Sequence, residues 1–467
     1  MGLKFDILRF KDILSDKYIR LDTKYRIFSD KNKFNIWNIK DTKPLSYYMQ
    51  PIISNILKKG ELDDEYYLID LKSIERKTNT LIDIEVVNEI GSDKAMLERG
   101  DLVVPKLEPK KGQFFLNLNH QKYIGSTELI EYKINLESAN PKFLYYILVN
   151  NKTLEAMSYM ESGKTHRRVQ SSDLLKIQIP NIFLDVQNEI VKKIEPIEQE
   201  IQNLKLQKKE HLDIINEIFG DELNFDWQEF NRLKNENIFS SSLLDFSNNL
   251  DLRFSYKFHN LEHKFLCKFL ISKTSKKIKD FISEPIVLGK GISPLLYDDD
   301  GEYYYIAMSN IKNYIFEVED CKKVGVDFYK QNINKSIKIN DILLARSGEG
   351  TIGKVAIIED EEVEGIFADF TMRIRLEKYN PTFAYYYFRS DFFQYLVYTH
   401  KKGLGNNTNI FPSQIQEFPI LDFALEKQKQ IVEKIKSKID SQKLIDEQIE
   451  QKQKEISDLI YQCIQEL

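Results

Sequence analysis

The chain has 467 residues, and 67 lysines and arginines against 72 aspartates and glutamates give a formal net charge of −5. A hydrophobic fraction of 42% excludes a largely disordered chain, and three scattered cysteines exclude a disulfide framework. No apolar run approaches the ~20 residues of a membrane helix, and the charged opening sequence lacks a signal-peptide core. We therefore expect a cytoplasmic protein without membrane contact, and the acidic balance argues mildly against a general nucleic-acid binder.

Short strands, a helix and a loop are predicted to follow one another in the first half. Aromatic and β-branched residues at 66–69 and an apolar run at 101–104 predict short strands. Asn140 and Pro141 open an aromatic-rich segment, which predicts a helix because a proline in the first turn sacrifices no hydrogen bond. The polar, basic stretch at 162–170 predicts a loop.

A long amphipathic helix closes the first half. Seam positions recur in alternating steps of four and three, which is the period of a coiled coil, with a few polar interruptions. Pro196 predicts a kink in this helix or the start of its regular part. The seam residues are Ile190, Ile194, Ile197, Ile201, Leu204, Lys208, His211, Ile215 and Ile218.

The second half repeats these segments in the same order. Strand-like runs return at 303–306 and 341–344, and Asn380-Pro381 follows Asn140-Pro141 at an offset of 240 residues. Several matches in one order, with offsets near half the chain, indicate a tandem duplication of one unit. The second seam comprises Ile431, Ile435, Lys438, Gln442, Ile445, Ile449, Lys452, Ile456, Leu459 and Cys463.

The predicted fold class is α/β (α+β), with two mixed α/β domains that are each followed by a long helix. We expect the first domain at 1–184, a central helix at 185–221, the second domain at 222–421 and a C-terminal helix at 422–467. Because the helices are copies of each other, we favour their pairing as an antiparallel coiled coil. The alternative is two unrelated amphipathic helices that each pack on their own domain.

A glycine-rich stretch at 348–355 matches dinucleotide-binding, kinase-like and incomplete P-loop patterns. A phosphate-binding loop must lead into a helix, whose N-terminus meets the anion. Here a strand-like run at 355–358 follows instead. We therefore interpret 348–355 as a strand-turn-strand hairpin whose glycines bring the backbone close to a ligand, and Arg346 and Ser347 at its start suggest a polyanion.

Other catalytic signatures fail as well. His259 and His263 are four residues apart, but no HExxH motif and no third metal ligand accompany them. The two Asn-Pro segments lack the second proline of a base-methylation motif, and no nuclease cluster stands out. We therefore predict a chain that is not an enzyme and that holds no metal or cofactor.

Recognition chemistry concentrates in two loops at equivalent places, 162–170 and 401–409. Arginine reads guanine edges, asparagine reads adenine edges, and lysine holds phosphates. The two loops differ in sequence while their flanking segments agree, as expected of two readers of different sequences; two solvated loops are the alternative. The candidate DNA contacts are Lys164, His166, Arg167, Arg168, Arg346, Ser347, Lys354, Lys401, Lys402, Asn406, Asn407 and Asn409, with Lys106, Lys110 and Lys111 as weaker phosphate candidates.

At this point the sequence resembles the specificity (S) subunit of type I restriction–modification systems. The resemblance rests on the strands at 100–104 and 340–357, the helices that open at Asn140 and Asn380, and the loops after them. It continues into QNEIVKKI and QKQIVEKI at the start of the two long helices. The first copy departs from the pattern at 105–115, which lacks the GxxGK element.

The resemblance implies a subunit without an active site. Two target recognition domains would each read one half of a bipartite site in double-stranded DNA. The coiled coil would set the spacer between the halves and dock two adenine methyltransferase subunits, which would use S-adenosylmethionine. A restriction/translocase subunit is a further partner that the resemblance allows. Three alternative functions remain: a specificity subunit of another methylation or restriction system, a non-DNA coiled-coil scaffold, and an enzyme that uses the glycine-rich stretch.

Overall fold

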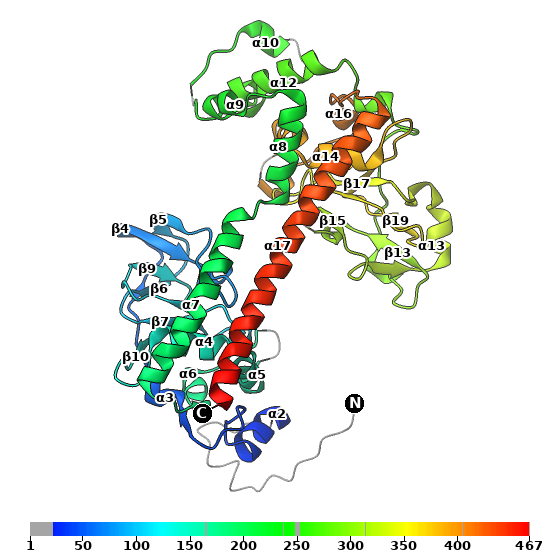
Figure 1. The fold of residues 1–467 in the computed structure, drawn as a ribbon. Coiled ribbons are helices and arrows are strands. Elements are labelled where there is room, and N and C mark those ends of the chain that lie inside the picture. Colours follow the sequence, from blue (N-terminus) through cyan, green and yellow to red (C-terminus); the bar gives the residue numbers. More distant parts are fainter. Residues whose placement is uncertain are drawn as a thin grey trace. The chain divides into compact units, whose positions relative to one another are not determined.

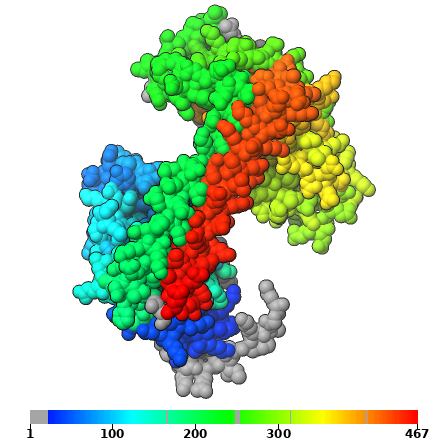
Figure 2. All heavy atoms as spheres, in the orientation of Figure 1, coloured from blue at the N-terminus to red at the C-terminus, as the bar shows by residue number. Residues whose placement is uncertain are grey.

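The computed structural model describes residues 22–163, 166–236, 238–247, 253–312, 314–403 and 405–466 (Figures 1 and 2). The chain forms two compact units. Unit 1 contains residues 1–207 and 445–467, and unit 2 contains residues 208–444. Across the described ranges, no helix combines the length and hydropathy that a membrane crossing requires.

Unit 1 contains two larger sheets. Short apolar and aromatic runs form their strands, as the residues at 66–69 and 101–104 predict. The first sheet is antiparallel in the order β2 (Met49–Pro51), β10 (Leu129–Ile134), β7 (Leu102–Pro105) and β8 (Phe115–Leu116). The second has the order β3 (Ile56–Leu57), β6 (Lys94–Leu97), β9 (Tyr123–Gly125), β4 (Gly60–Ile69) and β5 (Glu85–Ile90), with β4 and β9 parallel. A separate pair joins β1 (Thr42–Pro44) to β11 (Gln178–Pro180).

The helices of unit 1 pack on the first sheet around a core of aromatic and branched side chains. Asn140 caps the aromatic helix, since its side chain accepts the N–H of Phe143 at 3.1 Å, and Pro141 occupies the first helical position. This confirms the predicted helix. The helices are α2 (Thr23–Arg26), α3 (Leu45–Tyr48), α4 (Pro141–Val149), α5 (Asn151–Met160), α6 (Ser171–Leu174), α7 (Leu184–Gln207) and the last part of α17 (Leu425–Gln465).

The sheets of unit 2 repeat this plan. The first has the order β12 (Val287–Leu288), β20 (Thr371–Ile374), β17 (Ile342–Ala345) and β18 (Val355–Ile357). The second has the order β16 (Lys322–Val324), β13 (Tyr303–Ile306) and β19 (Gly365–Phe367), and β13 and β19 are parallel like β4 and β9. A small hairpin joins β14 (Ile311–Lys312) to β15 (Ile315–Phe316).

Helices cover the first sheet of unit 2 around its own aromatic core. Asn380 caps α14 through the N–H of Phe383 at 2.9 Å, as Asn140 caps α4. The helices are α8 (His211–Leu223), α9 (Trp227–Lys234), α10 (Leu243–Ser247), α11 (Tyr256–His259), α12 (Leu261–Lys273), α13 (Val326–Gln331), α14 (Pro381–Arg389), α15 (Asp391–His400), α16 (Pro412–Gln416) and the first part of α17. The strand order, parallel pair and caps confirm the tandem repeat.

The central helix is two helices. A single helix over 185–221 was expected, whereas α7 ends at Gln207 and α8 begins at His211. Pro196 lies inside α7, which continues past it, so the interruption is elsewhere. The N–H of Lys209 donates to Oε1 of Gln442 at 2.7 Å, and this side-chain acceptor satisfies a backbone group that the interruption releases.

The long helices pair in antiparallel fashion within each unit. In unit 2, Glu217 contacts Lys438 and Glu222 contacts Lys427, so the numbers rise along one helix as they fall along the other. In unit 1, Glu200 of α7 contacts Lys452 of α17. Figure 2 shows the red end of α17 beside the green α7 in unit 1. The buried seam comprises Ile190, Ile194, Ile197 and Ile201 with Ile449, Ile456 and Ile460 in unit 1, and Ile214, Ile215 and Ile218 with Ile431, Ile435 and Ile439 in unit 2.

Candidate nucleic-acid interface

Both predicted recognition loops close as short hairpins directly after a helix. In unit 1, Ser162 and Arg168 exchange backbone hydrogen bonds of 2.9 and 2.8 Å. In unit 2, Lys402 and Asn409 do the same at 2.8 and 2.7 Å. The two hairpins therefore occupy the same place in the repeat although their sequences differ.

Each hairpin is tied to the segment that leaves the central strand of the first sheet. In unit 1 this segment is 106–111, after β7, and the N–H of Glu108 donates to the carbonyl of Arg167 at 2.9 Å. In unit 2 it is 346–354, after β17, and the N–H of Gly348 donates to the carbonyl of Thr408 at 3.2 Å. We call 106–111 with 162–168 loop site 1, and 346–354 with 401–409 loop site 2.

The basic side chains of loop site 1 differ in their contacts. His166 and Arg167 are exposed, and Arg167 lies 3.9 Å from a carboxylate oxygen of Glu161. Arg168 instead donates two hydrogen bonds from its guanidinium group to the Glu128 carboxylate, at 3.0 and 2.9 Å. This bidentate contact holds the pKa of the Glu128 carboxyl below its usual value. Lys164 lies outside the described residues.

The lysines of segment 106–111 are also engaged. Lys110 forms an ion pair with the buried carboxylate of Glu161 at 2.8 Å, and Lys111 pairs with Glu108 at 2.5 Å. Lys106 donates to the carbonyl of Thr127 at 3.0 Å. Glu161 thus lies between Lys110 on one side and Arg167 on the other, and it links the two segments of loop site 1.

Loop site 2 repeats the arrangement with other residues. Lys401 pairs with Glu349 at 2.8 Å and lies over the ring of Tyr398, and the hydrogen bond from Lys401 lowers the pKa of Glu349. Arg346 donates to the carbonyl of Asp369 at 3.0 Å and lies over the ring of Phe370. In both sites, therefore, a candidate DNA contact is held by a carboxylate from a neighbouring segment.

The remaining candidates of loop site 2 differ in exposure. Ser347 is buried, and its hydroxyl donates to the carbonyl of Thr408 at 3.3 Å, so it supports the loop from inside. Lys402 and Asn407 are exposed, whereas Lys354 and Asn409 are half-buried. Asn409 donates to the carbonyl of Asn407 at 3.0 Å. The side chain of Asn406 lies outside the described part of the structure.

The glycine-rich stretch is the hairpin that the sequence predicts. β17 and β18 are antiparallel neighbours, and Gly348 and Gly353 have φ angles of 86° and 87°, which favour glycine. A Cβ on Gly353 would lie 2.7 Å from the Gln394 amide oxygen, so the turn packs closely on α15. A strand rather than a helix follows the turn, which argues against a nucleotide-binding loop.

The two histidines that the sequence singles out, His259 and His263, are buried in unit 2. His263 and the half-buried His400 have ring centroids 5.4 Å apart, and the His263 Nε2 atom lies 3.5 Å from the Cys267 sulfur. Burial lowers the pKa of His263 to about 3 and that of His400 to about 4. Within the described ranges, no cluster of three or more histidine, cysteine or carboxylate side chains is arranged to hold a metal ion.

Sequence reasoning missed the residues that hold the loops. Glu128 lies 40 positions from Arg168, so no local pattern connects them. Arg253 donates to the carbonyls of His400 at 2.9 Å and Lys401 at 2.6 Å, which fixes the start of the second hairpin. Glu349 could have been noticed, because it lies within the glycine-rich stretch opposite a lysine-rich loop.

Part of the second half of the chain is similar to a described protein family. Residues 274–455 match the family described as the type I restriction modification DNA specificity domain. The type I restriction enzyme HindI specificity subunit of Haemophilus influenzae is 21% identical over 164 residues, which are 33% of this chain and 35% of that protein. The alignment with this curated relative thus spans about a third of its length. These matches confirm the family resemblance that the sequence indicated.

Three solved structures resemble this chain at low sequence identity. A chain from a study of assembly and conformational transition in a type I R-M system is 13% identical, covers 91% of this chain and 96% of that chain, and gives a TM-score of 0.43. The S subunit from M. genitalium is 13% identical with coverages of 91% and 96% and a TM-score of 0.34. The HsdS subunit from Thermoanaerobacter tengcongensis is 12% identical with coverages of 91% and 95% and a TM-score of 0.32.

Proposed function

We infer that this chain, whose residues 274–455 belong to the type I restriction modification DNA specificity domain family, is a DNA specificity subunit in which each unit reads one half of a bipartite site. One observation carries the proposal. Both units have a hairpin that is bonded to the segment after an equivalent strand, β7 in unit 1 and β17 in unit 2, and the two hairpins have different polar side chains. A shared scaffold with exchanged side chains is what two readers of different base sequences require.

The side chains of the loop sites support distinct reading chemistry. Loop site 1 offers His166, Arg167 and Arg168, and an arginine fork matches the two acceptors of guanine in the major groove. Loop site 2 offers asparagine amides, which match adenine, and lysines for phosphates. The proposed DNA contacts are Lys164, His166, Arg167, Arg168, Arg346, Lys354, Lys401, Lys402, Asn406, Asn407 and Asn409, with Ser347 supporting the second loop.

The proposal assigns catalysis to partners. Residues 1–184 and 222–421 would be the target recognition domains, and the helices within 185–221 and 422–467 would set the spacer and dock two adenine methyltransferase subunits. Base flipping and methyl transfer from S-adenosylmethionine would take place in those subunits, and this chain would need no cofactor. A restriction/translocase subunit would join only in a system that also cuts DNA.

The test is methylation by the chain together with an adenine methyltransferase of a type I system. Co-expression should produce adenine methylation at a two-part motif, which sequencing that detects methylated bases would reveal. Exchange of residues 22–183 for the same segment of a relative should change one half of the motif and leave the other intact. A change in both halves, or methylation without any motif, would contradict the proposal.

A further inference from the structure

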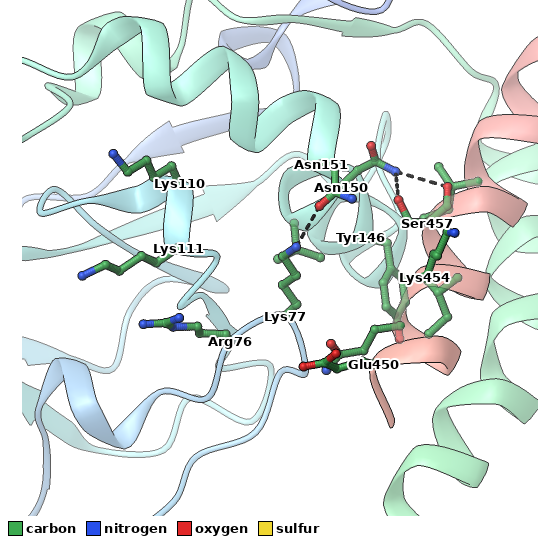
Figure 3. Close-up of a pocket in the computed structure, with 14 residues that line it drawn as sticks. Arg76, Lys77, Lys110, Lys111, Tyr146, Asn150, Asn151, Glu450, Lys454 and Ser457 are labelled. Atoms are coloured by element: carbon green, nitrogen blue, oxygen red, sulfur yellow. Dashed lines mark hydrogen bonds between the residues drawn. The ribbon is translucent and has the colours of Figure 1, made fainter. Parts of the chain in front are cut away.

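Unit 1 contains a groove of about 710 Å³ beside the aromatic helix α4. Figure 3 shows Arg76, Lys110 and Lys111 on one wall and the α17 residues Glu450 and Lys454 on the other. Asn150 closes the groove by donating to the hydroxyl of Ser457 at 3.0 Å. The lining contains five cationic side chains, Arg76, Lys77, Lys110, Lys111 and Lys454, against the single carboxylate of Glu450.

Because the two units are copies of one sequence unit, the grooves beside their aromatic helices can be compared. Unit 2 has a groove of about 520 Å³ beside α14, where Tyr386 takes the place of Tyr146. Its three cations are matched by three carboxylates: Arg389, Lys436 and Lys443 against Glu359, Asp360 and Asp440. A groove therefore lies beside the aromatic helix of each unit, but only the groove of unit 1 has an excess of positive charge among its lining residues.

Three cations of the unit 1 groove lack an acidic partner. Arg76 and Lys454 are exposed, and among the described residues neither side chain forms a hydrogen bond or an ion pair. Lys77 donates to the amide oxygen of Asn151 at 2.8 Å, and burial lowers the pKa of its ammonium. An anion in the groove would relieve that cost. Lys110 and Lys111 are already paired with Glu161 and Glu108.

The groove is continuous with loop site 1. Lys110 and Lys111 line it, and they belong to the segment whose Glu108 N–H bonds the carbonyl of Arg167. Glu161, which pairs with Lys110, also lies 3.9 Å from Arg167. A polyanion that crosses the recognition hairpin therefore meets the groove through the same short segment.

We propose that this groove binds the phosphodiester backbone of DNA next to the half-site of unit 1, with Arg76, Lys77 and Lys454 as the phosphate contacts. The inference rests on the proposed function. Phosphate contacts position a reader without selecting sequence, so the groove would anchor unit 1 on DNA of any sequence. Unit 2, whose groove is balanced in charge, would depend on loop site 2 alone.

The test compares the salt dependence of binding to a duplex of random sequence. The full chain, with its methyltransferase partner, would carry Arg76→Gln and Lys454→Gln together. Each phosphate contact contributes about 0.9 to the slope of log K against log salt, so between 50 and 200 mM salt the unmodified complex should lose roughly tenfold more affinity than the variant. The half-site preferences should not change.

The matched control carries Lys436→Gln and Lys443→Gln in the groove of unit 2, and its slope should equal that of the unmodified complex. An unchanged slope in the Arg76 and Lys454 variant would overturn the groove proposal alone. Loss of the methyltransferase from the variant with an unchanged slope would also overturn it, and would show that an acidic protein segment occupies the groove. Absence of DNA binding by the unmodified complex would overturn the proposed function as well.

Discussion

At the scale of residues, each loop site contains a cation that is already held by a carboxylate. Arg168 is held by Glu128, and Lys401 is held by Glu349. The pairs fix the direction of the cations, and they place a negative charge where a DNA phosphate would approach. Because these pairs are partly exposed, they contribute little to stability, and under the proposed function their main effect would be on which DNA is accepted.

Replacement of Glu128 by Gln should therefore weaken discrimination. Without the carboxylate, Arg168 is free to contact any phosphate, so affinity for a duplex of random sequence should rise about two- to tenfold, in line with removal of one like charge. Glu229→Gln, which removes one of the two carboxylates that hold the exposed Arg232 on α9, is the control and should have no effect. Fluorescence anisotropy with unrelated duplexes measures both. A fall in affinity for the random-sequence duplex would show that Glu128 does not limit the contact of Arg168 with DNA phosphates.

The buried histidines predict a pH dependence of unit 2. Burial keeps His263 and His400 neutral, with Arg253, His259, Cys267 and Tyr395 around them. Their folded pKa values of about 3 and about 4 lie below the ordinary value of 6.5, so below pH 6.5 the unfolded chain takes up protons that the folded chain does not. Stability should thus fall as pH falls, by up to about 2 kcal/mol per histidine at pH 5.

Thermal unfolding between pH 7 and pH 5 measures this effect. His263→Phe should flatten the decline of the melting temperature with falling pH, because one of the two suppressed titrations is removed. His120→Phe in unit 1 is the control, since the His120 side chain is 45% exposed. An identical decline in the His263 variant and the unmodified chain would exclude the assignment.

At the scale of elements, one glutamine in each unit joins the aromatic helix to the long helix. Oε1 of Gln187 accepts the N–H of Asn140 at 2.8 Å, and Oε1 of Gln428 accepts the N–H of Asn380 at 2.9 Å. Both glutamines are almost fully buried. The bond fixes the start of α4 or α14, and hence the helices that lead to the recognition hairpins.

Gln428→Ala should destabilise unit 2 by about 2–4 kcal/mol. The change leaves the Asn380 N–H and the Phe423 carbonyl, which accepts from Gln428 at 2.7 Å, without their partner in a buried region. Chemical denaturation measures the loss. Gln430→Ala, two residues further along the same helix at an exposed position, should change stability by less than about 0.5 kcal/mol. Equal effects of the two changes would refute this role.

Sequence patterns predict the elements whose signals are local. The Asn-Pro caps follow from helix-start chemistry, and the structure confirms them. Periodicity predicts most of the two seams, but Ile439, Ile460 and Ile464 are buried where Lys438, Leu459 and Cys463 were expected. The interruption between Gln207 and His211 could not be predicted, because the intervening residues favour helix and the group that satisfies the released N–H, Gln442, lies far along the chain. Likewise, the sequence identifies Arg168 as a candidate contact but cannot show that Glu128 already holds it.

At the scale of the whole molecule, the net charge of −5 conceals an uneven distribution. Positive side chains concentrate at the loop sites and in the groove of unit 1, while the balance elsewhere is acidic. The duplication also distributes one helix over both units: residues 425–444 of α17 belong to unit 2, and the rest of the helix belongs to unit 1.

A chain that stops after Leu444 should therefore lose unit 1 and keep unit 2. Ile449, Ile456, Ile460 and Ile464 belong to the core of unit 1, and burial of each contributes about 1.5–3 kcal/mol, which together rivals the stability of a typical domain. Hydrogen exchange should show rapid exchange in α4 and α7 and continued protection in α14. A chain that stops after Gln465 is the control. Retained protection in α4 would contradict the expectation.

The shared helix also dictates an order of events during synthesis. Domains usually fold as they leave the ribosome, the N-terminal one first. Here the isoleucines of α7 must wait for residues 445–466, which are made only after all of unit 2. The half that is translated first is thus the half that completes its core last, and in the interval its exposed helix is a natural client for chaperones.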